Sequence, residues 1–161
     1  SGGAALTFAA FRDTPFKLAS FRNNQSDELH MVYQMNHAWK PGSTVRPHIH
    51  VIPLAAATGV IRFVGQYAWA LSGVEAPANV GWTPFTVDHA VLASEVNKLD
   101  IISLAEVVPP AAAQESDCLL VYLKRDGGAP EDTYAGNLAA VSLDCHFQME
   151  KDGTDAEFPG D

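Results

Sequence analysis

Two histidines stand on alternate residues in the stretch GSTVRPHIHVIP, residues 42–53. Side chains alternate between the two faces of a β-strand, so His48 and His50 share one face if this stretch is extended. Imidazole nitrogens that lie side by side can bind one transition metal ion. The pair is therefore a candidate metal site, part of a candidate catalytic site, or a structural pair bonded to neighbouring backbone or carboxylate groups.

The spacing in GSTVRPHIH matches the opening of the cupin signature, in which a jelly-roll strand supplies two metal ligands. Cupins place a glutamate a few residues later, but the segment VIPLAAATGVIRF after His50 contains no acidic residue. His89, or the pair Asp144 and His146, would have to complete such a site through the tertiary structure. A cupin-like metal enzyme is therefore a lesser alternative.

A second metal arrangement needs several chains. Three copies around a symmetry axis would each direct His48 and His50 inward and offer six nitrogens to one transition metal ion. This arrangement resembles the fibre and spike tips of tailed phages, where such motifs recur. Short motifs give frequent false matches, so a purely structural role for the pair stays open.

Other signs of catalysis are missing from the sequence. It contains no GxSxG elbow, glycine-rich phosphate loop, HExxH helix or zinc-finger spacing. Glu131 and Asp132 lie in a loop without an evident acid–base partner, and we interpret them as a solvated turn. We therefore predict that the chain is not an enzyme. Four aromatic residues are expected in the core rather than on a sugar-binding face: Trp39, Tyr67, Trp69 and Trp82.

Composition limits the possible partners. With 161 residues and 47% hydrophobic content, the chain is long enough for one domain with a sizeable core. A formal charge of -9 and a pI near 4.9 disfavour nucleic acid and anionic membranes as partners. The sequence has no apolar run of about 20 residues, and we expect no secretory signal in SGGAALTFAAF, which lacks a basic start and a long apolar segment. Cys118 and Cys145 lie in apolar segments and are expected to be buried free thiols, although their pairing stays open.

The pattern of hydrophobic residues indicates strands. HMVYQMNHAW alternates between two faces, STVRPHIHVIP and VIRFVGQYAWAL extend likewise, and short runs follow at 82–96, 98–108, 118–126 and 138–150. Loops rich in Gly, Pro, Asn and Asp separate these runs. We predict a single all-β domain over residues 1–161: an antiparallel β-sandwich or jelly roll of about eight strands at 30–149, with an extended N-terminal arm and an acidic tail at 150–161.

Residues 1–29 show no persistent period, which favours an arm that lies across a neighbouring subunit. Its aromatic residues would be the interface anchors: Phe8, Phe11, Phe16 and Phe21. The alternative is that this segment adds a strand or two to the same domain.

Three segments in order resemble a widespread family of small tailed-phage virion proteins: HAWKPGSTVRPHIHVIP, GVIRFVGQYAWALSGV and EDTYAGNLAAVSLDCHFQMEKDGTD. The family has a Trp before a turn and a PHIHW-like strand, and it ends in a segment with the pattern D-T-Y/F-x-G followed by D-x-H-Y/F. The match covers residues 37–154. Val51 stands where the family often has Trp, and Cys145 where an aliphatic residue is usual.

The resemblance implies a virion component with a β-sandwich body. We expect a capsid decoration or cement protein that docks on the major capsid protein or other virion proteins and forms a homo-oligomer, by analogy a trimer. The close alternative is a tail-fibre or receptor-binding module. No cofactor is expected, apart from a transition metal ion that His48 and His50 would hold at a symmetry axis.

Overall fold

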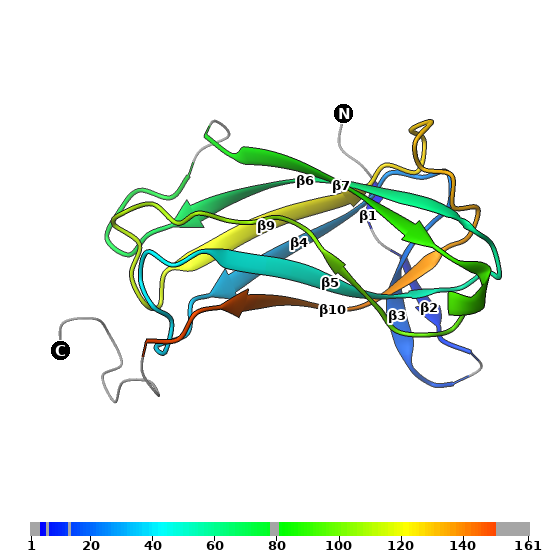
Figure 1. Ribbon diagram of the computed structural model, residues 1–161, viewed down its shortest axis with the longest axis horizontal. Helices are drawn as coiled ribbons and strands as arrows, with labels where there is room; N and C mark the ends of the chain where they lie inside the picture. Colours follow the sequence, from blue (N-terminus) through cyan, green and yellow to red (C-terminus); the bar gives the residue numbers. More distant parts are fainter. Residues whose placement is uncertain (1–3, 6, 13, 78–80, 151–161) are drawn as a thin grey trace.

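The computed structural model describes residues 4–5, 7–12, 14–77 and 81–150 and contains two five-stranded β-sheets in that part of the chain. Sheet 1 has the order β1 (Ala4–Ala5), β4 (Asp27–Gln34), β9 (Cys118–Arg125), β6 (Gly59–Ala70) and β7 (Thr83–Val91). Sheet 2 has the order β2 (Thr7–Ala10), β3 (Lys17–Phe21), β10 (Leu138–Phe147), β5 (Val45–Pro53) and β8 (Asp100–Ser103). One 3-10 turn, η1 (Ala93–Glu95), follows β7. Figure 1 shows the two sheets packed as an elongated sandwich.

The strand order is that of a jelly roll. From β3 to β10 the chain crosses to the other sheet after every strand except β6, which pairs with β7 through a hairpin-type connection. The resulting four-stranded orders, β4-β9-β6-β7 and β3-β10-β5-β8, interleave two Greek keys, and all their neighbouring strands are antiparallel. The predicted all-β jelly roll is confirmed. Strands β1 and β2 are added to this eight-stranded framework.

The N-terminal segment contributes strands to the same domain. β1 pairs with β4, while β2 and β3 form an antiparallel hairpin, described over residues 7–12 and 14–21, that continues sheet 2 beside β10. Phe21 is fully buried and its ring meets that of Phe63 edge-on at 5.2 Å, so it cannot anchor the chain to another subunit. Phe8 and Phe16 are 73% and 69% exposed, whereas Phe11 is half-buried. The alternative of extra strands therefore describes the strands β1, β2 and β3 of this segment. Of the predicted acidic tail, residues 151–161 lie outside the described residues.

Apolar side chains from both sheets fill the space between them. One cluster lies around Ile49, Ile61 and Phe63, and a second lies around Trp39, whose ring stacks on that of Trp69 at 5.8 Å. Trp39 is fully buried, as predicted, while Tyr67 and Trp69 pack against the same cluster. Trp82 is half-buried at the surface.

A buried ion pair joins strand β9 to the loop before β10. The guanidinium of Arg125 donates to both carboxylate oxygens of Asp132, at 2.9 and 2.7 Å, and neither side chain is exposed to solvent. The same guanidinium donates to the backbone oxygens of Tyr134 and Gly136. The prediction of a solvated turn is therefore wrong for Asp132. It holds only for the neighbouring Glu131, which is half exposed and pairs with Arg62 at 3.1 Å.

Candidate functional site

The two histidines of β5 lie on the outer face of sheet 2. Val45, Pro47, Ile49, Val51 and Pro53 are buried on the inner face, so the alternate residues point away from the core. His48 and His50 therefore share the outer face, as the sequence predicts. Across the sheet, His48 is in register with Asp144 of β10 and His50 with Ser142.

A β-bulge in β10 is what brings Asp144 to this face. Ala140 pairs with Val51, but the next register partner of β5, His50, pairs with Ser142, so one extra residue is accommodated at position 141. A bulge of one residue shifts the alternation of the side chains that follow it. Without the bulge, Asp144 would lie opposite Pro47 and point into the core. Sequence reasoning left Asp144 to the tertiary structure because a bulge has no clear signature in one sequence.

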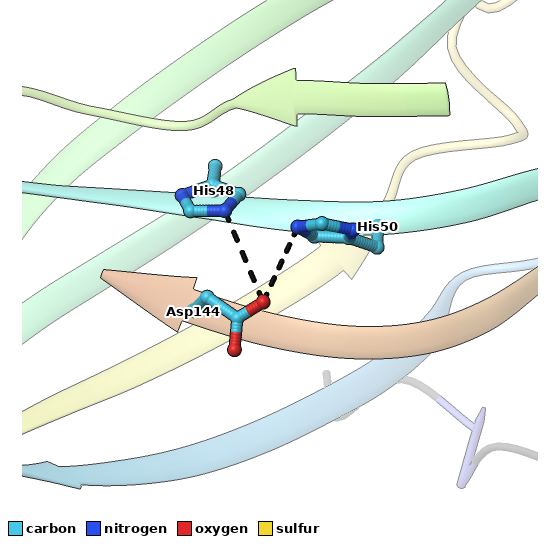
Figure 2. Close-up of side chains that lie close together, drawn as sticks. All are labelled: His48, His50 and Asp144. Carbon is cyan, nitrogen blue, oxygen red and sulfur yellow. Dashed lines mark ion pairs between the residues drawn. The ribbon is translucent and has the colours of Figure 1, made fainter. Parts of the chain in front are cut away.

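The side chains of His48, His50 and Asp144 point toward one another (Figure 2). The Oδ2 atom of Asp144 lies 3.2 Å from Nε2 of His50 and 3.9 Å from Nε2 of His48. One ligand atom from each of the three residues lies within 4.8 Å of the other two. The Asp144 carboxylate also accepts a hydrogen bond from Oγ of Ser142 at 3.2 Å. The arrangement offers two imidazoles and one carboxylate to a common point.

Burial decides the charge state of His48. Its side chain is 8% exposed, and desolvation lowers the pKa of His48 below its ordinary value. The imidazoles of His146 and His50 lower this pKa further, against a smaller opposing effect from the backbone of Arg46 and from Asp144. The His48 imidazole is therefore neutral near pH 7 and has a ring nitrogen with a free lone pair.

The other candidate ligands are placed differently. The ring of His146 lies 4.4 Å from that of His48, beside the three-residue group but outside it. His89 of β7 is turned to the edge of the sandwich, where its Nε2 lies 2.7 Å from Oδ2 of Asp100, the first residue of β8. That contact joins an edge strand of sheet 1 to an edge strand of sheet 2. His89 is thus not brought to the β5 pair.

A second surface feature is an apolar groove on the open side of the sandwich. On this side β3 pairs only with residues 138–140 of β10, and β1 pairs only with residues 27–28 of β4. Between β4 and β10, which are uncovered beyond these residues, lies a groove of about 350 Å³. Its lining includes Phe8, Leu18, Leu29, Met31, Val141 and Leu143. The groove therefore places apolar side chains beside strand edges that lack a partner over most of their length in the described residues.

A separate hollow lies on the outer face of sheet 1. His30, Gln66, Trp82 and Tyr122 line a hollow of about 390 Å³. The rings of His30 and Tyr122 are 5.1 Å apart, and the Tyr122 hydroxyl donates to Glu28 at 2.8 Å. Burial, followed by this hydrogen bond to a carboxylate, raises the pKa of Tyr122 to about 12. The hollow combines aromatic faces with polar groups.

The two cysteines are free and lie in different sheets. Cys118 begins β9 in sheet 1 and is half-buried, whereas Cys145 of β10 is 8% exposed and points into the second core cluster. Burial raises the pKa of Cys145 to about 12. The prediction of free thiols agrees with this placement, whereas the prediction of burial holds for Cys145 and is wrong for Cys118.

We expect a thiol reagent to modify one cysteine per native chain rapidly and both cysteines after denaturation. The reason is that Cys145 is reached only when the second core cluster opens. Titration with a chromogenic disulfide reagent, with and without denaturant and without reductant, measures both numbers. A chain with no reactive thiol in denaturant would instead contain a Cys118–Cys145 disulfide, contrary to the structure.

Comparisons with known proteins give a structural likeness at low sequence identity. No family model matches the chain, and no curated protein matches it. A solved structure described as "Family 16 Carbohydrate Binding Module-2" is similar to 83% of this chain and to 79% of its own chain, with 16% sequence identity and a TM-score of 0.38. Among the described residues, no helix has the length and apolar character that a membrane crossing requires.

Proposed function

We propose that this chain is a structural protein of a tailed-phage particle and that it decorates the head as a cement protein. The role is non-catalytic. The observation that carries the proposal is the open side of the sandwich, where an apolar groove lies between partly unpaired strands β4 and β10. The resemblance of residues 37–154 to phage virion proteins supports it, because such proteins work by packing against copies of themselves and against a shell.

The groove suits a neighbouring copy of the same chain. Residues 29–34 of β4 and 141–147 of β10 lack a strand partner on this side among the described residues, so their backbone groups can pair with a strand of another copy. Burying the apolar lining would contribute roughly 25 cal/mol per Å², less the cost of ordering the partner. We propose that copies associate along this groove, as a trimer.

The β2–β3 hairpin suits attachment to the shell. It carries Phe8 and Phe16, two of the most exposed large hydrophobic side chains in the described part of the chain. An exposed aromatic ring gains free energy when a partner covers it. We propose that Phe16, which lies outside the groove lining, contacts the shell, while Phe8 lies at the border between the two surfaces.

Point variants test both contacts. We expect Phe16→Ser to prevent attachment to heads that lack this chain, with the oligomer mass unchanged, and Val141→Ser to shift the oligomer toward monomer. Sedimentation with heads and analytical ultracentrifugation give the two measurements. Deleting residues 1–20 would be a poor test, because it removes most of β3 together with the hairpin.

The control is Val74→Ser. Val74 is 60% exposed in the loop between β6 and β7, which lies at the opposite end of the sandwich from the β2–β3 hairpin (Figure 1). This variant should keep both attachment and mass. If Phe16→Ser and Val74→Ser attach equally well, the hairpin does not dock on the shell. If the wild-type chain is a monomer at all concentrations, the groove does not hold a second copy.

The hollow on sheet 1 favours a second candidate, a tail-fibre or receptor-binding module. Aromatic faces such as those of Trp82 and Tyr122 stack on sugar rings, and Gln66 offers hydrogen bonds. Under this alternative, Trp82→Ala would reduce adsorption of the particle to host cells. Gold-labelled antibody on virions separates the candidates, because label over the whole head excludes a fibre tip.

A further inference from the structure

The outer face of sheet 2 collects metal-ligating groups from two strands of one chain. His48 and His50 come from β5 and Asp144 from β10, and the β-bulge at position 141 sets their common direction. Backbone pairing between β5 and β10 runs along the whole of both strands, so the three side chains start from a rigid platform. Ligands on paired strands need little ordering when an ion binds.

The distances are close to those of a bound ion. Ligand atoms held tetrahedrally about 2.0–2.2 Å from zinc lie roughly 3.3–3.6 Å apart. Nε2 of His50 and Oδ2 of Asp144 are already 3.2 Å apart, and Nε2 of His48 lies 3.9 Å from the same oxygen. The Asp144 side chain is 52% exposed and can move toward the imidazoles. Small side-chain rotations therefore suffice to bring all three atoms to one ion.

The hydrogen bonding of the group also indicates a missing partner. Nε2 of His50 is buried and makes no hydrogen bond in the described part of the chain, although Oδ2 of Asp144 lies 3.2 Å away. A buried polar nitrogen without a partner is costly. A cation between His50 and Asp144 would satisfy both groups, whereas a purely structural pair leaves the nitrogen unsatisfied.

We propose that His48, His50 and Asp144 bind one divalent transition metal ion per chain through two imidazole nitrogens and one carboxylate oxygen. Imidazole with carboxylate suits ions of the zinc, nickel and cobalt group. The carboxylate faces solvent, so water fills the remaining positions. Ser142 orients the carboxylate through its hydroxyl. The inference does not depend on the proposed role in a phage particle.

This site differs from an ion on a threefold axis. There, three chains would share one ion and each would contribute only its two histidines. Here a third ligand, Asp144, comes from the same chain, so one chain is enough to hold the ion. The two arrangements predict different stoichiometries: one ion per chain in the site proposed here, and one ion per three chains on an axis.

Zinc binding to the full chain tests the proposal. After treatment with a chelator, equilibrium dialysis against zinc chloride should give one zinc per chain. His50→Ala and Asp144→Asn should each weaken binding by about tenfold or more, because each removes one of three ligands. Asp144→Asn keeps the shape of the side chain and so guards against a folding defect, which circular dichroism checks in every variant.

Two further variants serve as controls. His30→Ala removes an exposed histidine from the outer face of sheet 1 and should leave zinc affinity unchanged. His146→Ala removes the imidazole beside His48 and should change affinity by less than the ligand variants do. Absence of saturable binding, one zinc per three chains, or equal affinity in His50→Ala and His30→Ala would each overturn the proposal.

Discussion

Replacing Asp132 by alanine is expected to lower the free energy of unfolding by about 3–5 kcal/mol, because it leaves the buried guanidinium of Arg125 without its counter-charge. Both side chains are fully buried, and Asp132 accepts two hydrogen bonds from Arg125 and one from the backbone N–H of Arg62. The remaining bonds of Arg125, to the backbone oxygens of Tyr134 and Gly136, carry no compensating charge. Urea denaturation followed by tryptophan fluorescence measures the loss.

Glu131→Ala is the matched control, since it removes the neighbouring carboxylate. Glu131 pairs with Arg62 at 3.1 Å but is half exposed, and exposed pairs contribute between about 0 and 1 kcal/mol. The two variants should therefore differ by several-fold in their loss of stability. Equal losses would mean that the Arg125–Asp132 pair is not closed to water in solution.

The second large effect is expected at Trp39. Trp39→Ala should lower the free energy of unfolding by about 3–5 kcal/mol, because it empties the centre of the second core cluster. Trp39 is fully buried, and its ring stacks on Trp69 at 5.8 Å. Thermal and urea unfolding, monitored by far-ultraviolet circular dichroism, give the change without relying on the removed fluorophore.

Trp39→Phe separates packing from hydrogen bonding at this site. The indole nitrogen of Trp39 has no hydrogen-bond partner among the described residues, so phenylalanine loses ring volume but no polar contact. We expect a smaller loss than for alanine. If phenylalanine cost as much as alanine, the stability at this position would depend on the indole N–H rather than on the ring.

Much of the framework could be predicted from the alternation of hydrophobic residues. The runs that overlap β4 to β10 each predict a strand, although β4 begins at Asp27, inside the predicted arm, and the shared face of His48 and His50 follows from β5 alone. These features are local, since a strand with one buried face repeats every second residue. The order and register of strands in the two sheets depend on contacts between distant segments. The sequence therefore predicts the fold class but not which strands pair.

The buried pair of Arg125 and Asp132 is a case in which local composition predicts the wrong environment. Charged residues in a loop with Gly and Pro usually face solvent, which led to the prediction of a solvated turn. A signal was nevertheless present: Leu119, Val121 and Leu123 alternate on one face of β9, and Arg125 continues that face into the core. An arginine on a buried face needs a nearby carboxylate.

The N-terminal segment shows a different limit. Its strands are short, and among its described residues Phe21 is the one hydrophobic side chain that is fully buried, so the hydrophobic pattern of residues 1–29 has no detectable period. Two-residue β1 and four-residue β2 exist because neighbouring strands offer them hydrogen bonds. Tertiary pairing of this kind overrides local preference and is not visible in the segment itself.

The extra residue in β10 decides which of the side chains that follow it point outward. Without the bulge, a regular ladder over the same residues would pair Val141 with His50, turn Leu143 and Cys145 to the solvent and turn Asp144 toward the apolar interior. Deleting Val141 would instead remove the bulge and leave Asp144 opposite His48. The register of β10 against β5, rather than the letters of the DCHF segment, therefore decides whether the carboxylate faces outward.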